Sequence, residues 1–148
     1  MKMSLIPKEH VIGIWRSVCV FLEEASDSVR QRHDIVDIME ECMSGKQILW
    51  VIFDDENDND IMGALTTSSV AYPRYVALSI PYMGGREMMK YRDLIIDVLS
   101  RFARDNGYTS IEAYGRDAWG RVGRKYGFRK AYSVFDLDLT EEIKMAAE

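Results

Sequence analysis

Ile48-Leu49-Trp50-Val51-Ile52-Phe53 is the stretch that decides the fold, together with the acidic turn 54–60 and the run 61–65 (Ile-Met-Gly-Ala-Leu) that follows it. The first run is continuous, apolar and rich in β-formers, which is typical of a strand buried on both faces. A polar turn between two such runs predicts a hairpin. A third strand is predicted at 75–80, after a turn at Pro73. The centre of the molecule is therefore predicted to be an antiparallel meander.

Two helices are predicted before this meander. Pro7 suits the first position of a helix, and the apolar residues after it repeat at helical spacing. Asp27-Ser28 is suited to cap the second helix, and Gly45 to end it. The apolar faces consist of Val11, Trp15, Val18, Cys19 and Leu22 in the first helix, and of Ile35, Val36, Met39, Cys42 and Met43 in the second.

The pattern after the meander predicts a crossover. Gly84-Gly85 is predicted to break the chain before a long helix, 88–106, which ends at Asn106-Gly107. A short strand 110–114, a short helix from Asp117 to Gly127 and a last strand carrying Phe135, Leu137 and Leu139 follow. This order predicts a single α/β (α+β) domain over residues 1–148. Its central sheet is mixed, mostly antiparallel and flanked by helices, and residues 140–148 form a short exposed tail.

Composition excludes several classes of function. The net charge of -5 and the pI near 5.1 argue against a nucleic-acid partner. The sequence contains no run of 18 or more apolar residues, so no membrane span is predicted. The N-terminus does not resemble a signal peptide. A cytoplasmic protein is the expectation, with Cys19 and Cys42 as buried free thiols. No cysteine or histidine spacing indicates a metal site, and neither His10 nor His33 lies in a catalytic pattern.

This order of elements resembles the GNAT (GCN5-related N-acetyltransferase) superfamily over roughly residues 5–139. The segments that carry the resemblance are 61–65, the strand 75–80 with the helix 88–106, and Arg124-Lys125-Tyr126-Gly127-Phe128. The resemblance implies acetyl-CoA as cofactor, with its pyrophosphate on backbone amides at the start of the long helix. It implies Tyr126 as a catalytic candidate. The implied cofactor-binding residues are Leu78, Ile80, Gly84, Gly85, Arg86, Lys90 and Arg116.

The chain departs from that family's pattern at its working positions. Met88 and Lys90 stand where the family has small residues, and Glu87 adds a negative charge near the phosphates. Arg116 and Gly123 stand where it has an asparagine and a proton-donating tyrosine. Gly84-Gly85 is open to a second interpretation, a turn that opens a helix, and Tyr126 to another, packing on the sheet. These departures predict weakened or lost acetyl transfer.

A narrower resemblance is to small phage-encoded GNAT-like proteins. It rests on Tyr82-Met83-Gly84-Gly85, on Gly115-Arg116-Asp117-Ala118-Trp119 and on Gly127-Phe128. It implies an alternative function, a non-catalytic virion or assembly protein that uses the scaffold for protein contacts. The partner would be a protein of a phage particle or a second copy of the chain, and the location the host cytoplasm or the virion. A basic helix that binds a phosphate ligand in another class of enzyme is a third interpretation.

Overall fold

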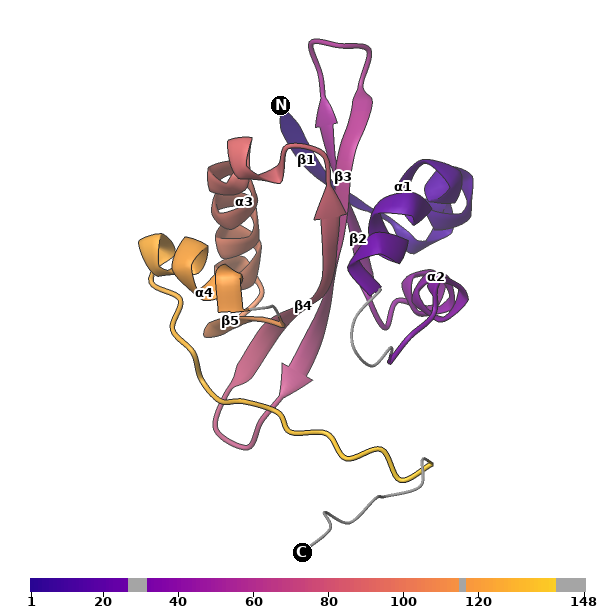
Figure 1. The fold of residues 1–148 in the computed structure, drawn as a ribbon. Coiled ribbons are helices and arrows are strands. Elements are labelled where there is room, and N and C mark those ends of the chain that lie inside the picture. Colours follow the sequence, from indigo (N-terminus) through magenta and orange to yellow (C-terminus); the bar gives the residue numbers. More distant parts are fainter. Residues whose placement is uncertain (27–31, 115–116, 141–148) are drawn as a thin grey trace, which may run out of the picture. The chain divides into compact units, whose positions relative to one another are not determined.

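The computed structural model describes residues 1–26, 32–114 and 117–140, and the chain divides into two compact units, Met1–Tyr114 and Gly115–Glu148 (Figure 1). The elements of the first unit are β1 (Lys2–Ile6), the 3₁₀ turn η1 (Lys8–His10), α1 (Val11–Ser26), α2 (Ile35–Ser44), β2 (Ile48–Asp54), β3 (Asp60–Ala71), β4 (Val76–Gly85), the 3₁₀ turn η2 (Met88–Lys90), α3 (Arg92–Asp105) and β5 (Ser110–Ala113).

In the described part of the chain, five strands form one sheet in the order β1-β2-β3-β4-β5. All neighbours are antiparallel except β4 and β5, which run parallel. α1 and α2 lie on one side of the sheet and α3 lies on the other (Figure 1). The predicted mixed, mostly antiparallel sheet with flanking helices is confirmed, and so is the predicted hairpin, in which Trp50 pairs with Leu65.

Two apolar cores explain why residues 48–53 carry no polar side chain. Leu49 and Val51 belong to the core shared with α1 and α2. Trp50 and Ile52 belong to the core shared with α3. Because successive side chains of a strand point to opposite faces, a strand covered on both sides must be apolar throughout. The Trp50 indole N–H is satisfied by donating to the Thr67 hydroxyl at 2.9 Å.

The start of α2 differs from the prediction. The helix begins at Ile35, and its cap is Asp34, whose side chain accepts a hydrogen bond from the Asp37 amide. The Asp37 side chain accepts in return from the Asp34 amide, which completes a capping box. The predicted cap, Asp27-Ser28, lies outside the described residues. Gly45 ends the helix as predicted, in a left-handed conformation with φ of 85°.

Three further predictions need correction. Residues 2–6, which were not assigned to an element, form the edge strand β1, so Pro7 precedes a 3₁₀ turn rather than opening α1. Gly84-Gly85 does not break the chain, because β4 runs through both glycines and α3 starts only at Arg92. The last strand is absent from the described residues: 128–140 have no regular structure, and Phe135 is 92% exposed.

The described part of the second unit contains α4 (Asp117–Gly123) and the 3₁₀ turn η3 (Arg124–Tyr126). Gly127 ends this pair in a left-handed conformation, with φ of 92°. A Cβ at Gly123 would lie 2.9 Å from Cβ of Phe128, so the chain folds back closely there. The predicted tail lies outside the described residues from Glu141 onward, and the single domain over 1–148 stays a prediction. Among the described residues, no helix has the length and apolar character of a membrane span.

Candidate functional site

The strand predicted to hold the cofactor is β4, and it extends beyond its parallel partner. Leu78 and Ile80 are buried and pair with Ile111 and Ala113. The pair Ile80–Ala113 is the last one of this ladder, whereas β4 continues to Gly85. Beyond Ile80, β4 pairs with β3 alone among the described strands. The backbone of residues 81–85 therefore has one edge without a ladder partner in the described part of the chain.

Close packing explains the two glycines of β4. A Cβ at Gly84 would lie 2.2 Å from the Phe21 carbonyl oxygen of α1. A Cβ at Gly85 would lie 2.6 Å from Sδ of Met88 and 2.8 Å from Cα of Gly63. Real Cβ atoms do not approach so closely, so only glycine fits at either position. The space beside both glycines is already filled by atoms of the protein itself.

Arg86 and Lys90, the two cations predicted to meet phosphates, have partners within the loop. Arg86 Nη2 lies 3.1 Å from Asp60 Oδ2 and donates to the Ile61 carbonyl at 2.9 Å. Lys90 Nζ lies 2.8 Å from Glu87 Oε1, and this hydrogen bond holds the pKa of the Glu87 carboxyl below its usual value. All four side chains are about half exposed or more. Such surface pairs contribute little, so an anion can displace them.

The loop before α3 has a defined shape. Glu87 adopts a left-handed conformation with φ of 56°, and the Lys90 amide donates to its carbonyl to close the turn η2. The buried Tyr91 hydroxyl donates to the Arg86 and Met62 carbonyls. Burial raises the pKa of Tyr91, with Glu87 adding to the effect. The loop thus places Arg86 and Lys90 just before the N-terminus of α3.

The predicted residues between 78 and 90 lie along β4 and the loop that follows it, whereas the other two predicted residues lie elsewhere in the chain. Tyr126 is a half-buried residue of η3 in the second unit, with Lys125 Nζ 5.6 Å from its ring centroid. Arg116 lies outside the described residues. The roles of these two residues therefore stay predictions.

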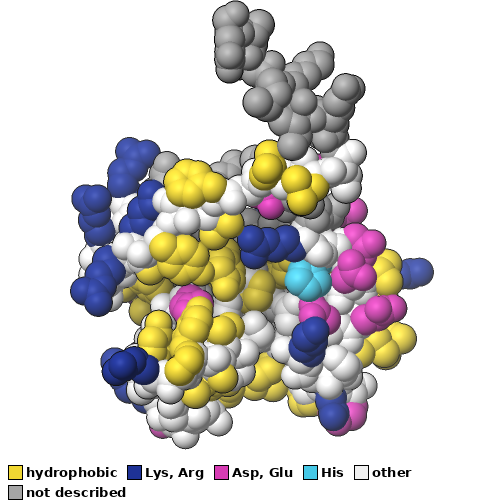
Figure 2. All heavy atoms as spheres, turned by 90° about the horizontal axis from the view of Figure 1, so that it is seen from below, with side chains coloured by type: hydrophobic (Ala, Val, Ile, Leu, Met, Phe, Trp, Pro, Cys, Tyr) yellow, Lys and Arg dark blue, Asp and Glu magenta, His cyan; other side chains and the backbone are white. Residues whose placement is uncertain are grey.

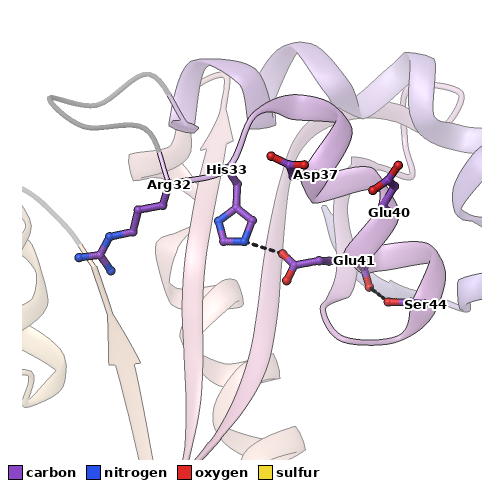
Figure 3. A pocket seen from close by; sticks show the side chains of 6 residues that line it. All are labelled: Arg32, His33, Asp37, Glu40, Glu41 and Ser44. Atoms are coloured by element: carbon purple, nitrogen blue, oxygen red, sulfur yellow. Dashed lines mark hydrogen bonds and ion pairs between the residues drawn. The ribbon is translucent and has the colours of Figure 1, made fainter. Parts of the chain in front are cut away.

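Sequence reasoning missed a hydrogen-bonded triad of Tyr82, His33 and Glu41. His33 Nδ1 lies 2.7 Å from the Tyr82 hydroxyl, and His33 Nε2 lies 2.7 Å from Glu41 Oε2. Figure 3 shows the His33 ring directed at the Glu41 carboxylate of α2. His33 precedes α2, whereas Tyr82 belongs to β4 and lies far away in sequence. No spacing in the sequence indicates this triad, because only the packing of α2 on the sheet creates it.

Glu41 is the charged end of the triad. Burial alone would raise its pKa, but the hydrogen bond from Gln47 and the charges of His33 and Lys46 outweigh burial and hold the pKa below its ordinary value. Glu41 is therefore a carboxylate at neutral pH and accepts hydrogen bonds only. When the His33 ring carries a single proton, the Glu41 carboxylate favours that proton on Nε2, which leaves Nδ1 to accept from Tyr82. Burial raises the pKa of Tyr82, with Glu41 adding to the effect, so Tyr82 keeps its proton.

An open pocket of about 420 Å³ adjoins this triad. Figure 2 shows a face on which a histidine borders acidic and basic side chains. In Figure 3, Asp37 and Glu40 project from α2, and Arg32 points to the opposite side of the pocket. Six residues line the pocket: Arg32, His33, Asp37, Glu40, Glu41 and Ser44. Among the described residues, no group of three or more candidate ligands for a metal ion occurs.

Comparison with solved structures identifies the fold. A probable acetyltransferase superposes on 96% of this chain and 100% of its own, with a TM-score of 0.72 and 11% identity. The chain has the fold of the GNAT acetyltransferases. A ribosomal-protein-alanine N-acetyltransferase from Brucella melitensis biovar Abortus 2308 covers 94% of this chain and 100% of its own (TM-score 0.68, 10% identity). A soil-metagenome aminoglycoside acetyltransferase in complex with sisomicin covers 95% and 96% (TM-score 0.67, 11% identity). No family model and no curated protein sequence matches the chain.

Proposed function

We propose that the chain is an acyl-CoA-dependent N-acyltransferase with a modified cofactor loop, and that acetyl-CoA is its acyl donor. One observation carries this proposal: β4 extends past its last pair with β5 and leads directly into the loop before α3. The free edge of residues 81–85 offers backbone groups to an extended amide-containing chain, as an added strand would use them. Such a chain would run from that edge towards the cations of the loop.

The residues of the loop fit a phosphate group in part. Arg86 and Lys90 are exposed cations before a helix of 14 residues, and the N-terminus of a helix favours anions. Gly84 and Gly85 do not contribute an open cradle, since protein atoms occupy the space beside them. When bound, acetyl-CoA would supply an activated thioester carbonyl. Side-chain charge would replace the close backbone approach that glycines allow in the family.

Calorimetry with acetyl-CoA tests this proposal. Binding in the submillimolar range is expected, and Arg86→Ala and Lys90→Ala should each weaken it about tenfold, the usual effect of losing one charged hydrogen bond. Arg101→Ala is the matched control, because Arg101 pairs with Asp97 within α3 and lies away from the loop. Absence of binding at millimolar acetyl-CoA would remove the proposal.

A second candidate is a non-catalytic assembly protein, in contact with a protein of a phage particle or with a second copy. Two observations favour it: the filled space beside the glycines of β4, and five apolar side chains in residues 132–139 that are each at least 60% exposed. Exposed apolar side chains gathered in one segment are typical of a contact surface. The five are Tyr132, Val134, Phe135, Leu137 and Leu139. Light scattering that finds a monomer, together with binding of acetyl-CoA, would exclude this candidate.

A further inference from the structure

We propose that Tyr82, His33 and Glu41 form a proton relay that deprotonates the acceptor amine. This inference rests on the proposed acyl transfer and names its base, for which the sequence offered no pattern. Tyr82 is the residue that would touch the amine. His33 would take the proton, and Glu41 would hold the imidazole in position.

The first support is the geometry of the triad. Both contacts of His33 measure 2.7 Å, and they leave the ring from opposite nitrogens. Glu41 is itself anchored, because Gln47 Nε2 donates to it at 2.7 Å and Lys46 Nζ lies 3.3 Å away. A base whose second nitrogen is oriented by a carboxylate is the arrangement that activates hydroxyl groups in enzymes.

The second support is the position of Tyr82. It lies two residues after Ile80, where the ladder between β4 and β5 ends, so it belongs to the stretch of β4 with the free edge. Tyr82 packs against the core on the side of α1 and α2, whereas Met83 packs on the side of α3. The pocket lined by His33 and Glu41 lies on the same side of β4, so solvent reaches the other two members of the triad.

The proton balance of the step is as follows. A neutral amine forms a new N–C bond to the acyl carbon while the C–S bond to coenzyme A breaks. The proton lost by the amine nitrogen goes to Tyr82 Oη as the Tyr82 proton moves to Nδ1 of His33. The resulting imidazolium is stabilised by Glu41, and it returns the proton to the departing thiolate through solvent. The step needs no oxidant, reductant or metal.

A purely structural role is the rival explanation, because the triad also ties α2 to β4. The two roles differ in what a minimal substitution changes. Tyr82→Phe removes one hydroxyl and keeps the ring in the core. Loss of a structural tie lowers the melting temperature and leaves the pH dependence of turnover intact. Loss of a relay removes turnover from a protein that is still folded.

Steady-state kinetics with acetyl-CoA as donor and sisomicin as acceptor is the first experiment. Sisomicin is an aminoglycoside and carries several amino groups. Tyr82→Phe and His33→Gln should each lower kcat/KM about 100-fold, the lower range for loss of general base catalysis. In both variants the decline of kcat/KM at low pH that a relay gives the wild type should be lost, while the protein stays folded and the Kd for acetyl-CoA stays unchanged. His10→Gln, a change of the other histidine on the exposed turn η1, is the control expected to keep wild-type rates.

Nitrogen NMR of the His33 ring is the second experiment, and it needs no turnover. The relay requires the Nε2–H tautomer at pH 8 and a change in the Nδ1 signal in Tyr82→Phe. The ring signals must be interpreted together with the groups that surround the triad. These are Arg32, Asp37, Glu40, Glu41, Lys46 and Tyr82 of β4.

The outcomes separate the two proposals. If acetyl-CoA does not bind, the proposed function falls and the relay falls with it. If acetyl-CoA binds and the relay variants keep wild-type kcat/KM, or the wild type does not turn over sisomicin, the relay alone is overturned. A His33 ring protonated on Nδ1 at pH 8 overturns it as well.

Discussion

Gly84 shows how one residue can fix the distance between a helix and a strand. The Phe21 carbonyl of α1 lies where a Cβ at this position would stand, so any side chain would push the helix away from the sheet. Overpacking of this kind costs about 1–3 kcal/mol. We expect Gly84→Ala to lower the free energy of unfolding by at least this amount, as measured by urea denaturation.

Gly13 provides the control for this prediction. It lies inside α1 and no atom lies within 4 Å of an added Cβ. Gly13→Ala should therefore stabilise the protein by about 1 kcal/mol through helix propensity. Equal stability of the wild type and Gly84→Ala would contradict the close approach.

The two cysteines should differ in reactivity. Cys42 is 1% exposed, and burial raises the pKa of its thiol to about 12. Cys19 is only half-buried, which corrects the prediction that both thiols are buried. Since thiolate is the reactive form, a thiol reagent at pH 8 should label Cys19 in the folded protein and spare Cys42. Mass spectrometry of labelled Cys19→Ser should find no label, and rapid labelling of this variant would rule out the burial of Cys42.

At the scale of the element, α2 depends on its capping box. Asp34 and Asp37 each accept a hydrogen bond from the other's amide, at 2.9 and 3.0 Å. Asp34→Ala should lower the free energy of unfolding by about 1 kcal/mol, the usual effect of losing an N-cap. Asp34→Ser keeps a capping oxygen and should retain most of the stability. If both variants unfold at the same denaturant concentration, the cap is not the cause.

The elements also show what the sequence can and cannot predict. Residues 48–53 and the apolar face of α3 were predictable because each is packed along its whole length. The pattern of apolar residues in the sequence therefore shows which faces are buried. β1 was missed because it is a short edge strand whose side chains are mostly exposed. Gly84 and Gly85 were misread because turns and close approaches of backbone both require glycine. His33 and Tyr82 meet only through tertiary packing, which no local pattern encodes.

At the scale of the whole molecule, the described residues of both cores all belong to the first unit. A chain that ends at Tyr114 should therefore keep the five-stranded sheet and unfold cooperatively. Circular dichroism in the far and near ultraviolet during a thermal melt tests this. Loss of the near-ultraviolet signal at low temperature would show that residues 115–148 are needed for packing.

The pKa of Glu41 gives the whole molecule an acid-sensitive component of stability. Its folded pKa lies below its ordinary value of 4.5, so its contribution is complete above the unfolded pKa and is lost as pH falls through the folded pKa. Glu41→Gln should flatten the decline of stability below pH 5, as followed by urea denaturation at several pH values. An unchanged slope would mean that Glu41 has no favourable partners in the folded state.

The pairing of β1 has a consequence for the protein during its synthesis. Lys2 pairs with Phe53 and Ile6 with Leu49, so β1 leaves the ribosome before β2, the strand with which it pairs. α1 and α2 are translated between the two strands and can form in the meantime, because the hydrogen bonds within a helix are local. The nascent chain therefore carries β1 unpaired through the synthesis of both helices. β1 can pair with β2 only when the ends of the long segment between them come together, which costs loop-closure entropy.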